Sequence, residues 1–149
     1  MKKLLVSRCL LGESCRYDGK SKPCRAVLDL KERFILIPVC PECDGGLPTP
    51  RVPSERVGDR VLNREGKDVT CEYMAGARHA LAVCIAEGID TAVLKARSPS
   101  CGKGKIYDGS FTRTLVEGDG VTVEYLKAHG IKIYTEDELD ALEKGGREE

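Results

Sequence analysis

Three of the eight cysteines in this 149-residue chain are placed where chemistry can be expected. Each follows a short apolar segment that reads as a β-strand: Cys9, Cys40 and Cys101. In open parallel sheets, ligands bind beyond the carboxyl ends of the strands, and neighbouring strands lie only about 4.8 Å apart. Three thiols that leave the same edge of such a sheet are therefore predicted to converge.

Converging thiolates carry several negative charges and need a metal centre to balance them. Zinc with three cysteine ligands and one open position is one solution. The other is a cubane iron–sulfur cluster with three protein ligands, whose remaining iron acts as a Lewis acid toward a substrate. Sulfur on the substrate is a soft donor that matches such an iron.

The residues next to these cysteines have side chains that can move protons. Glu42 lies two positions after Cys40 in a proline-rich segment and can act as a general acid or base. Ser98 and Ser100 precede Cys101 in a Ser-Pro-Ser-Cys motif. Either serine can cap a turn, which is the common role, or orient water or substrate. Four further side chains can offset charge or bind substrate: Arg16, Tyr17, Arg51 and Arg97.

Four other cysteines have a less suggestive placement. Cys71 and Cys84 fall in the strongest expected helix, where a packed core thiol is the better interpretation. Cys15 and Cys24 lie in or beside the first loop, and either can be incidental.

Cys43 completes a Cys-x-x-Cys pair with Cys40, a pattern found in metal and redox sites. A thioredoxin-type pair normally opens a helix. Here Gly45, Gly46 and further prolines follow, so we expect a constrained loop instead. We therefore rank Cys43 below Cys40 as a ligand.

The elements that must position these residues alternate along the chain. Strands are expected at residues 3–7, 34–39, 91–95 and 131–134. Helices are expected at residues 25–33, 69–87 and 121–129, and from a capping box at 135–138 to about residue 144. Loops are expected at residues 12–22, 40–55 and 101–120, with a small hairpin within 56–67 that turns at 63–66.

This alternation predicts an α/β fold. The strand segments are continuously apolar, which is typical of a parallel sheet covered on both faces. Right-handed crossovers then give a single-domain Rossmann-like α/β/α sandwich with a small, mostly parallel sheet over residues 1–149.

Composition narrows the location and the partners. Acidic and basic residues balance at 24 each, so no global charge draws the chain to nucleic acid or to an anionic membrane. No apolar run approaches the roughly 20 residues of a spanning helix, and the apolar start is too short for a signal peptide. Eight cysteines in such a chain point to metal or catalysis in the reducing cytoplasm.

Several motifs, in order along the chain, resemble the bacterial family catalogued as domain of unknown function 523, which includes thiouracil desulfidase. They are Ser7-Arg8-Cys9-Leu10-Leu11-Gly12, Arg16-Tyr17-Asp18-Gly19, Pro38-Val39-Cys40-Pro41-Glu42, Gly45-Gly46-Leu47, Pro50-Arg51, Leu94-Lys95 with Ser98-Pro99-Ser100-Cys101-Gly102, Ile106-Tyr107-Asp108-Gly109 and Gly118-Asp119-Gly120-Val121. The resemblance implies a non-redox hydrolysis in which thiouracil becomes uracil and sulfide is left on the cluster.

The resemblance also implies roles for individual residues. A [4Fe-4S] cluster would be bound by Cys9, Cys40 and Cys101. Glu42 would be the catalytic acid–base group. The catalytic serine would lie in the Ser-Pro-Ser-Cys motif, where Ser98 is preferred and Ser100 stays open.

Three functional hypotheses follow. The first is a cluster-dependent desulfidase whose partner is a small thiolated base or nucleoside. The second is a non-enzymatic carrier or store of zinc, iron–sulfur or sulfide, which extra thiols such as Cys15, Cys24 and Cys43 would favour. The third, action on thiolated tRNA, is disfavoured by the neutral charge and the lack of a mixed basic–aromatic stretch.

Overall fold

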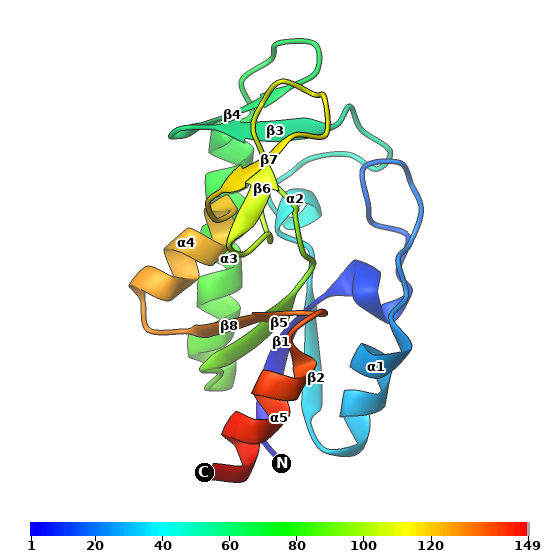
Figure 1. Cartoon of the computed structure of the whole chain (residues 1–149), viewed down its shortest axis with the longest axis vertical. Helices are drawn as coiled ribbons and strands as arrows, with labels where there is room; N and C mark the ends of the chain where they lie inside the picture. Colours follow the sequence, from blue (N-terminus) through cyan, green and yellow to red (C-terminus); the bar gives the residue numbers. More distant parts are fainter. Residues whose placement is uncertain (149) are drawn as a thin grey trace.

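Four parallel strands form the central sheet of the computed structural model, which describes residues 1–148 (Figure 1). They are β1 (Lys3–Ser7), β2 (Ile35–Val39), β5 (Thr91–Leu94) and β8 (Lys132–Thr135). Their order is β2-β1-β5-β8, and every neighbouring pair is parallel. All four strands predicted from the sequence are confirmed, as is the parallel α/β fold class.

Helices cover both faces of this sheet. One face packs against α3 (Thr70–Glu87) and α4 (Val121–Ala128), the other against α1 (Arg25–Leu28), its 3-10 continuation (Asp29–Glu32) and α5 (Leu139–Glu148). Alternate residues of β1 pack against the two helix layers, because successive side chains of a strand point in opposite directions. Leu5 packs with the α3–α4 core, whereas Leu4 and Val6 pack on the other side.

The helix ends follow local sequence signals. α3 ends at Gly88, whose φ of +68° places it in the left-handed region that glycine adopts without strain. Before α5, Glu138 Oε1 accepts a hydrogen bond from Thr135 N (3.0 Å), and Thr135 Oγ1 accepts one from Asp137 N (3.2 Å). The capping motif is thus present, and α5 continues beyond the predicted end.

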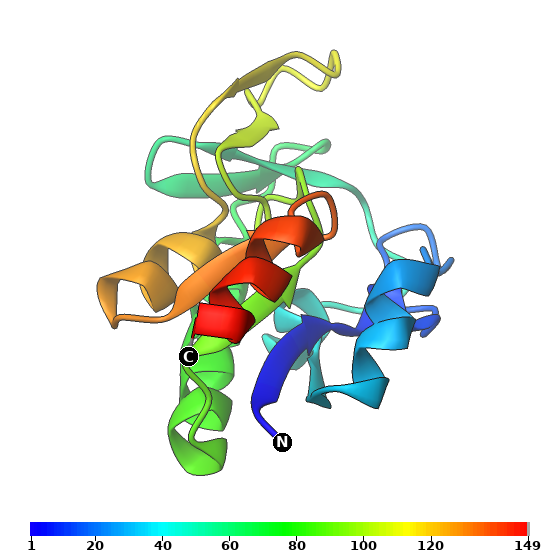
Figure 2. The same cartoon turned by 60° about the horizontal axis from the view of Figure 1, so that its bottom comes forward.

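Two antiparallel hairpins lie beyond the sheet, in teal and in yellow-green in Figure 2. The first pairs β3 (Ser54–Val57) with β4 (Arg60–Asn63). It confirms the predicted hairpin but turns at Gly58, with a φ of +59°. The predicted turn position was wrong because Asn63 caps the following turn, where its Oδ1 accepts hydrogen bonds from Glu65 N and Lys67 N.

The second hairpin replaces a segment predicted to be a loop. β6 (Lys105–Tyr107) pairs with β7 (Leu115–Glu117). The loop prediction was wrong because these strands have only three residues each and are stabilised by tertiary packing around buried Ile106. Within residues 1–148, no helix is both long and apolar enough to cross a membrane.

Candidate functional site

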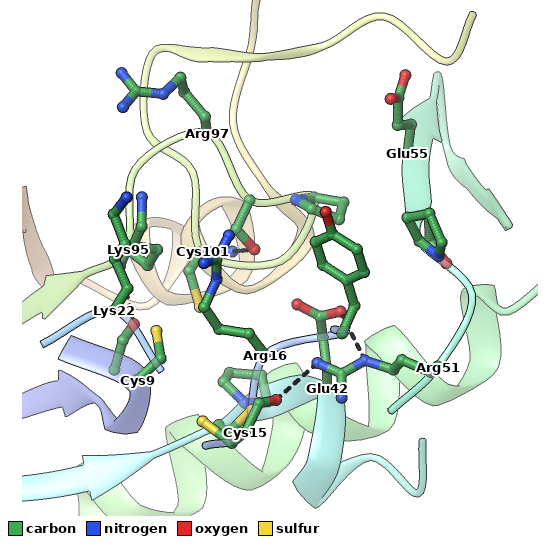
Figure 3. Close-up of a pocket in the computed structure, with 18 of the residues that line it drawn as sticks. Cys9, Cys15, Arg16, Lys22, Glu42, Arg51, Glu55, Lys95, Arg97 and Cys101 are labelled. Carbon is green, nitrogen blue, oxygen red and sulfur yellow. Dashed lines mark hydrogen bonds and ion pairs between the residues drawn. The ribbon is translucent and has the colours of Figure 1, made fainter. Parts of the chain in front are cut away.

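A cavity of about 570 Å³ opens at the carboxyl end of the sheet (Figure 3). It is lined by the residues that follow β1, β2 and β5 and by the loops around them. Cys9, Cys40 and Cys101, the three residues predicted to converge, all line it.

Each of these cysteines is held by a different local structure. Cys9 sits in a 3-10 turn that directly follows β1. Cys40 directly follows β2 and precedes the one-turn helix α2 (Pro41–Asp44), where its backbone N–H donates to Asp44 Oδ2 at 3.1 Å. Cys101 lies in a turn after β5, where its backbone N–H donates to Ser98 Oγ at 3.0 Å. The sulfur atoms of Cys9 and Cys101 point into the same space in Figure 3.

Burial and mutual repulsion raise the pKa of two of these thiols, those of Cys40 and Cys101. Desolvation raises the pKa of Cys101 to about 12, and negative charge at Cys40 and Glu42 adds to the effect. The pKa of Cys40 is raised even more. The largest cause is a hydrogen bond with Cys15, and the second is burial. A bound metal reverses this balance, because a coordinated thiol loses its proton.

The donor set fits a soft metal centre such as an iron–sulfur cluster, because thiolates are its usual ligands. Among the described residues, no three His, Cys, Asp or Glu side chains already surround one metal position. The thiols would therefore have to change their side-chain orientation to close around a cluster.

Two thiols that the sequence left aside lie beside these three. Cys15 lines the cavity and is close enough to hydrogen-bond with the thiols of Cys9 and Cys40. Its carbonyl oxygen lies 3.8 Å from Cys40 Sγ and 3.5 Å from Cys43 Sγ. Cys15 follows Cys9 within the loop that leaves β1, and that shared origin was the signal that could have identified it.

The remaining cysteines lie apart from the cavity lining. Cys84 is a buried core thiol, as predicted, but Cys71 on the same helix is exposed, so the prediction of a packed thiol there was wrong. The two residues are 13 positions apart along α3, and Cys71 falls on its solvent face in the first turn. Cys24 is partly buried against the α1 layer.

The Cys-x-x-Cys pair does open a helical turn, contrary to the loop predicted there. Pro41 occupies the first helical position, where its fixed φ is favourable. Contact with α3 stabilises the turn and depends on two glycines. A Cβ at Gly45 would lie 2.0 Å from Glu72 O, and one at Gly76 would lie 1.9 Å from Pro41 O. This close approach joins two segments that are far apart in the sequence, so it cannot be predicted from the four residues of the Cys-x-x-Cys pair.

Helix α2 directs Glu42 into the cavity lining. Glu42 Oε1 accepts a hydrogen bond from the Tyr73 hydroxyl at 2.6 Å and one from Arg51 Nε at 3.3 Å. Burial raises the pKa of Tyr73 well above its ordinary value, and the Glu42 carboxylate raises it further, so the phenol is the donor.

Arg51 connects Glu42 with the surrounding loops. Its guanidinium also donates to Cys15 O at 3.0 Å and to Pro48 O at 3.1 Å. Burial alone would lower the pKa of Arg51, but the negative charges of Glu42 and Cys43 raise it overall. Arg51 therefore stays charged while its side chain is only 6% exposed.

The two serines of the Ser-Pro-Ser-Cys motif have different surroundings. Ser98 lines the cavity, and its Oγ accepts hydrogen bonds from Ser100 N (3.1 Å) and Cys101 N (3.0 Å). Ser100 is fully buried, and its hydroxyl pairs with Thr122 Oγ1 at 2.7 Å. The structure thus brings Ser98 to the cavity and leaves Ser100 behind its wall.

The cavity is strongly basic although the whole chain is neutral. Two carboxylates line it, Glu42 and Glu55, against eight cations: Arg8, Arg16, Lys22, Arg51, Arg64, Lys95, Arg97 and Arg113. Arg8, Arg51 and Lys95 form ion pairs with acidic side chains. For the other five, the described part of the chain offers no ion pair. Such a lining favours an anionic or polarised ligand.

An α/β sheet with clustered thiols and a carboxylate at its carboxyl edge is the architecture of a metal-dependent enzyme site. The chain belongs to the 2-thiouracil desulfurase family, the group also catalogued as domain of unknown function 523, whose model matches residues 4–138. The resemblance predicted from the motifs is therefore confirmed.

Two relatives are similar over nearly their whole length. The uncharacterized protein YbbK of Bacillus subtilis (strain 168) is 37% identical, over 93% of this chain and 99% of its own. A solved structure described as the [4Fe-4S]-dependent thiouracil desulfidase TudS is 45% identical. It superposes with a TM-score of 0.90 over 97% of each chain.

Proposed function

We propose that this protein is a [4Fe-4S]-dependent desulfidase that removes sulfur from a thiolated pyrimidine by non-redox hydrolysis. The observation that carries the proposal is the meeting of Cys9, Cys40 and Cys101 with Glu42 in one cavity. Membership of the 2-thiouracil desulfurase family and the likeness to the TudS desulfidase support the same reaction.

Cys9, Cys40 and Cys101 would hold the cluster as thiolates. Bound by three protein ligands, a cubane cluster supplies one open iron, a Lewis acid suited to substrate sulfur. The reaction needs water as its only co-reactant: water adds to the carbon that carries sulfur, the carbon–sulfur bond breaks, and uracil and sulfide are the products.

Glu42 and Ser98 would manage the protons of this hydrolysis. The Glu42 carboxylate can take a proton from the attacking water and return one to the product. Ser98 Oγ already accepts two backbone hydrogen bonds, which leaves its own O–H to donate to substrate or water. This favours Ser98 over Ser100, whose hydroxyl is engaged with Thr122.

The rest of the lining suits a thiolated base or nucleoside. Three aromatic side chains, Tyr17, Tyr107 and Phe111, offer flat faces to a pyrimidine ring. The unpaired cations of the lining would attract a polarised ring or an anionic group attached to it. A single domain over residues 1–149 and a reducing cytoplasmic location, in keeping with eight free cysteines, complete the proposal.

The test is anaerobic reconstitution followed by turnover of 2-thiouracil, measured by its ultraviolet absorbance and by sulfide release. We expect turnover from the loaded protein and none from the cluster-free protein. A fully loaded protein that acts on no thiolated base or nucleoside would overturn the desulfidase assignment.

Cys15 and Cys43 favour one alternative function, because their thiols exceed the three that a cluster needs. A carrier of zinc or sulfide would use them as additional ligands. Metal analysis of anaerobically purified protein separates the two functions. Zinc with no acid-labile sulfide and no turnover would support the carrier.

A further inference from the structure

We propose that Tyr73 is a positioning residue for Glu42: its buried hydroxyl holds Oε1 of the carboxylate and leaves Oε2 for proton transfer. This inference rests on the proposed function, because it assumes that Glu42 carries the proton. The contact joins two residues 31 positions apart, one on α3 and one on α2.

The hydrogen bond is short and partly buried. The donor–acceptor distance is 2.6 Å, compared with 3.3 Å for the bond from Arg51 to the same oxygen. Tyr73 is 1% exposed and is not part of the cavity lining, so it acts through Glu42 and not on a substrate. A hydrogen bond to an ionised carboxylate is among the stronger hydrogen bonds in proteins.

The backbone fixes this contact as much as the side chains do. Glu42 precedes Gly45 by one helical turn, and Tyr73 precedes Gly76 by one turn. The glycines are the points where α2 and α3 touch, since a Cβ at either would overlap a carbonyl oxygen of the other helix. The two side chains are therefore held in one register by the helix contact.

The Tyr73 ring is also fixed by its neighbours. It packs in a small core with Val61, Val69 and Ala77, and Ser54 makes a hydrogen bond with the phenol oxygen. The ring of Tyr73 therefore contributes packing, and its hydroxyl separately contributes the hydrogen bonds. Phenylalanine at this position would keep the packing and remove only the hydrogen bonds.

Arg51 has a different role, although it shares the same carboxylate oxygen. It also binds the carbonyl oxygens of Cys15 and Pro48, so its loss would release two loops together with Glu42. Tyr73 offers the cleaner test because its hydroxyl donates to Glu42 and its only other hydrogen-bond partner among the described residues is the Ser54 side chain, so no loop carbonyl oxygen is released.

The experiment compares cluster-loaded wild type, Tyr73→Phe and Tyr125→Phe. Tyr125 packs against the same small core but lies outside the cavity lining, which makes it a matched control for loss of a hydroxyl. We expect Tyr73→Phe to lower kcat per bound cluster about 10- to 100-fold, the cost of a misplaced catalytic group, with KM changed less than about twofold. Tyr125→Phe should match wild type.

Two further measurements decide whether this loss of kcat comes from a displaced Glu42 carboxylate. A crystal structure of Tyr73→Phe should show the Glu42 carboxylate rotated or in several orientations. In a Glu42→Gln background, Tyr73→Phe should cost nothing further, because it acts through Glu42. A wild-type kcat for Tyr73→Phe, an unmoved carboxylate, or a full additional loss in that background would overturn the proposal.

The same set of variants keeps the two levels of inference apart. If Glu42→Gln retains full activity, the assignment of Glu42 as the proton carrier is wrong, and the role of Tyr73 falls with it. If Glu42→Gln is inactive while Tyr73→Phe behaves as wild type, the catalytic assignment stands and only the positioning role is overturned.

Discussion

The floor and the rim of the cavity are built in opposite ways. The floor consists of thiols in the segments that follow the strands, with Cys9, Cys15 and Cys101 each less than 10% exposed. The rim consists of cations carried by the loops, among them Arg16, Lys22, Arg64, Arg97 and Arg113. The floor is buried against the sheet and the rim is exposed on loops, which is the division between a rigid scaffold and adaptable contacts found in many enzymes.

The difference also concerns charge. Burial raises the pKa of Cys101 to about 12, and for Cys15 a hydrogen bond with Cys40 lowers the pKa but a hydrogen bond with Cys9 and burial raise it overall to about 11. The rim cations stay charged and mostly wet. We infer that the floor determines the chemistry and the rim determines which substrates enter, and the two can be changed separately.

The largest effect should come from Glu42, at the boundary of floor and rim. Glu42→Gln keeps the shape of the side chain but removes its capacity to exchange a proton. We expect kcat to fall about 10²- to 10⁴-fold with the cluster retained, as for loss of a general acid–base group. Cluster absorbance and turnover of 2-thiouracil, measured on one preparation, check this. A loss of cluster equal to the loss of activity would make Glu42 structural.

Reaction with iodoacetamide should separate the floor thiols from an ordinary cysteine. Only the thiolate reacts, and with a pKa of about 12 roughly one Cys101 in 10⁴ is ionised at pH 8. In the cluster-free protein we expect Cys101 to react at least about 100-fold more slowly than exposed Cys71, and its rate to rise about tenfold per pH unit. Mass spectrometry of digested peptides gives both rates. Equal rates at pH 8 would mean that the floor is open and solvated.

Much of the floor could be predicted because few rules decide it. Continuous apolar segments identified four strands, and parallel strands put their carboxyl ends at one edge, so Cys9, Cys40 and Cys101 had to approach one another. The family resemblance favoured Ser98 over Ser100, but residue types and spacing alone could not separate the two. Both hydroxyls belong to one motif, and only the turn directs one into the cavity and the other toward Thr122.

The contacts that position Glu42 could not be predicted for a different reason. Helix α2 exists because Gly45 and Gly76 let two distant segments touch, and no local signal reports a partner about 30 residues away. The same holds for the hairpin β6–β7, whose three-residue strands are too short for a periodic pattern. Tertiary contact overrides local sequence in both places.

A substitution at this helix contact should disturb the floor without touching the rim. Gly76→Ala puts a Cβ 1.9 Å from Pro41 O, so α2 must move away from α3. We expect a loss of about 1–3 kcal/mol in the free energy of unfolding, typical of overpacking, measured by urea denaturation. Arg78→Ala, an exposed site on the same helix, is the control. Unchanged stability and activity in Gly76→Ala would show that the contact is not needed.

The smallest effects should come from single cations of the rim. We expect Arg97→Ala or Arg113→Ala to raise KM about two- to fivefold, as for partly exposed charges, with kcat and cluster content unchanged. Added salt should reduce the difference from wild type, because screening weakens exposed charges. Steady-state kinetics at low and high ionic strength check both points. A fall in kcat at constant KM would place these arginines in the chemistry and remove the distinction between floor and rim.

The central claim is that three particular thiols hold the cluster. Its most direct test is the iron and acid-labile sulfide content of anaerobically reconstituted wild type and of single Cys→Ser variants. We expect about four irons and four sulfides per wild-type chain, the composition of a [4Fe-4S] cluster. Cys9→Ser, Cys40→Ser and Cys101→Ser should each lose most of both, whereas Cys15→Ser, Cys43→Ser and the exposed control Cys71→Ser should retain them. Full cluster content in Cys101→Ser, or its loss in Cys43→Ser, would contradict the account.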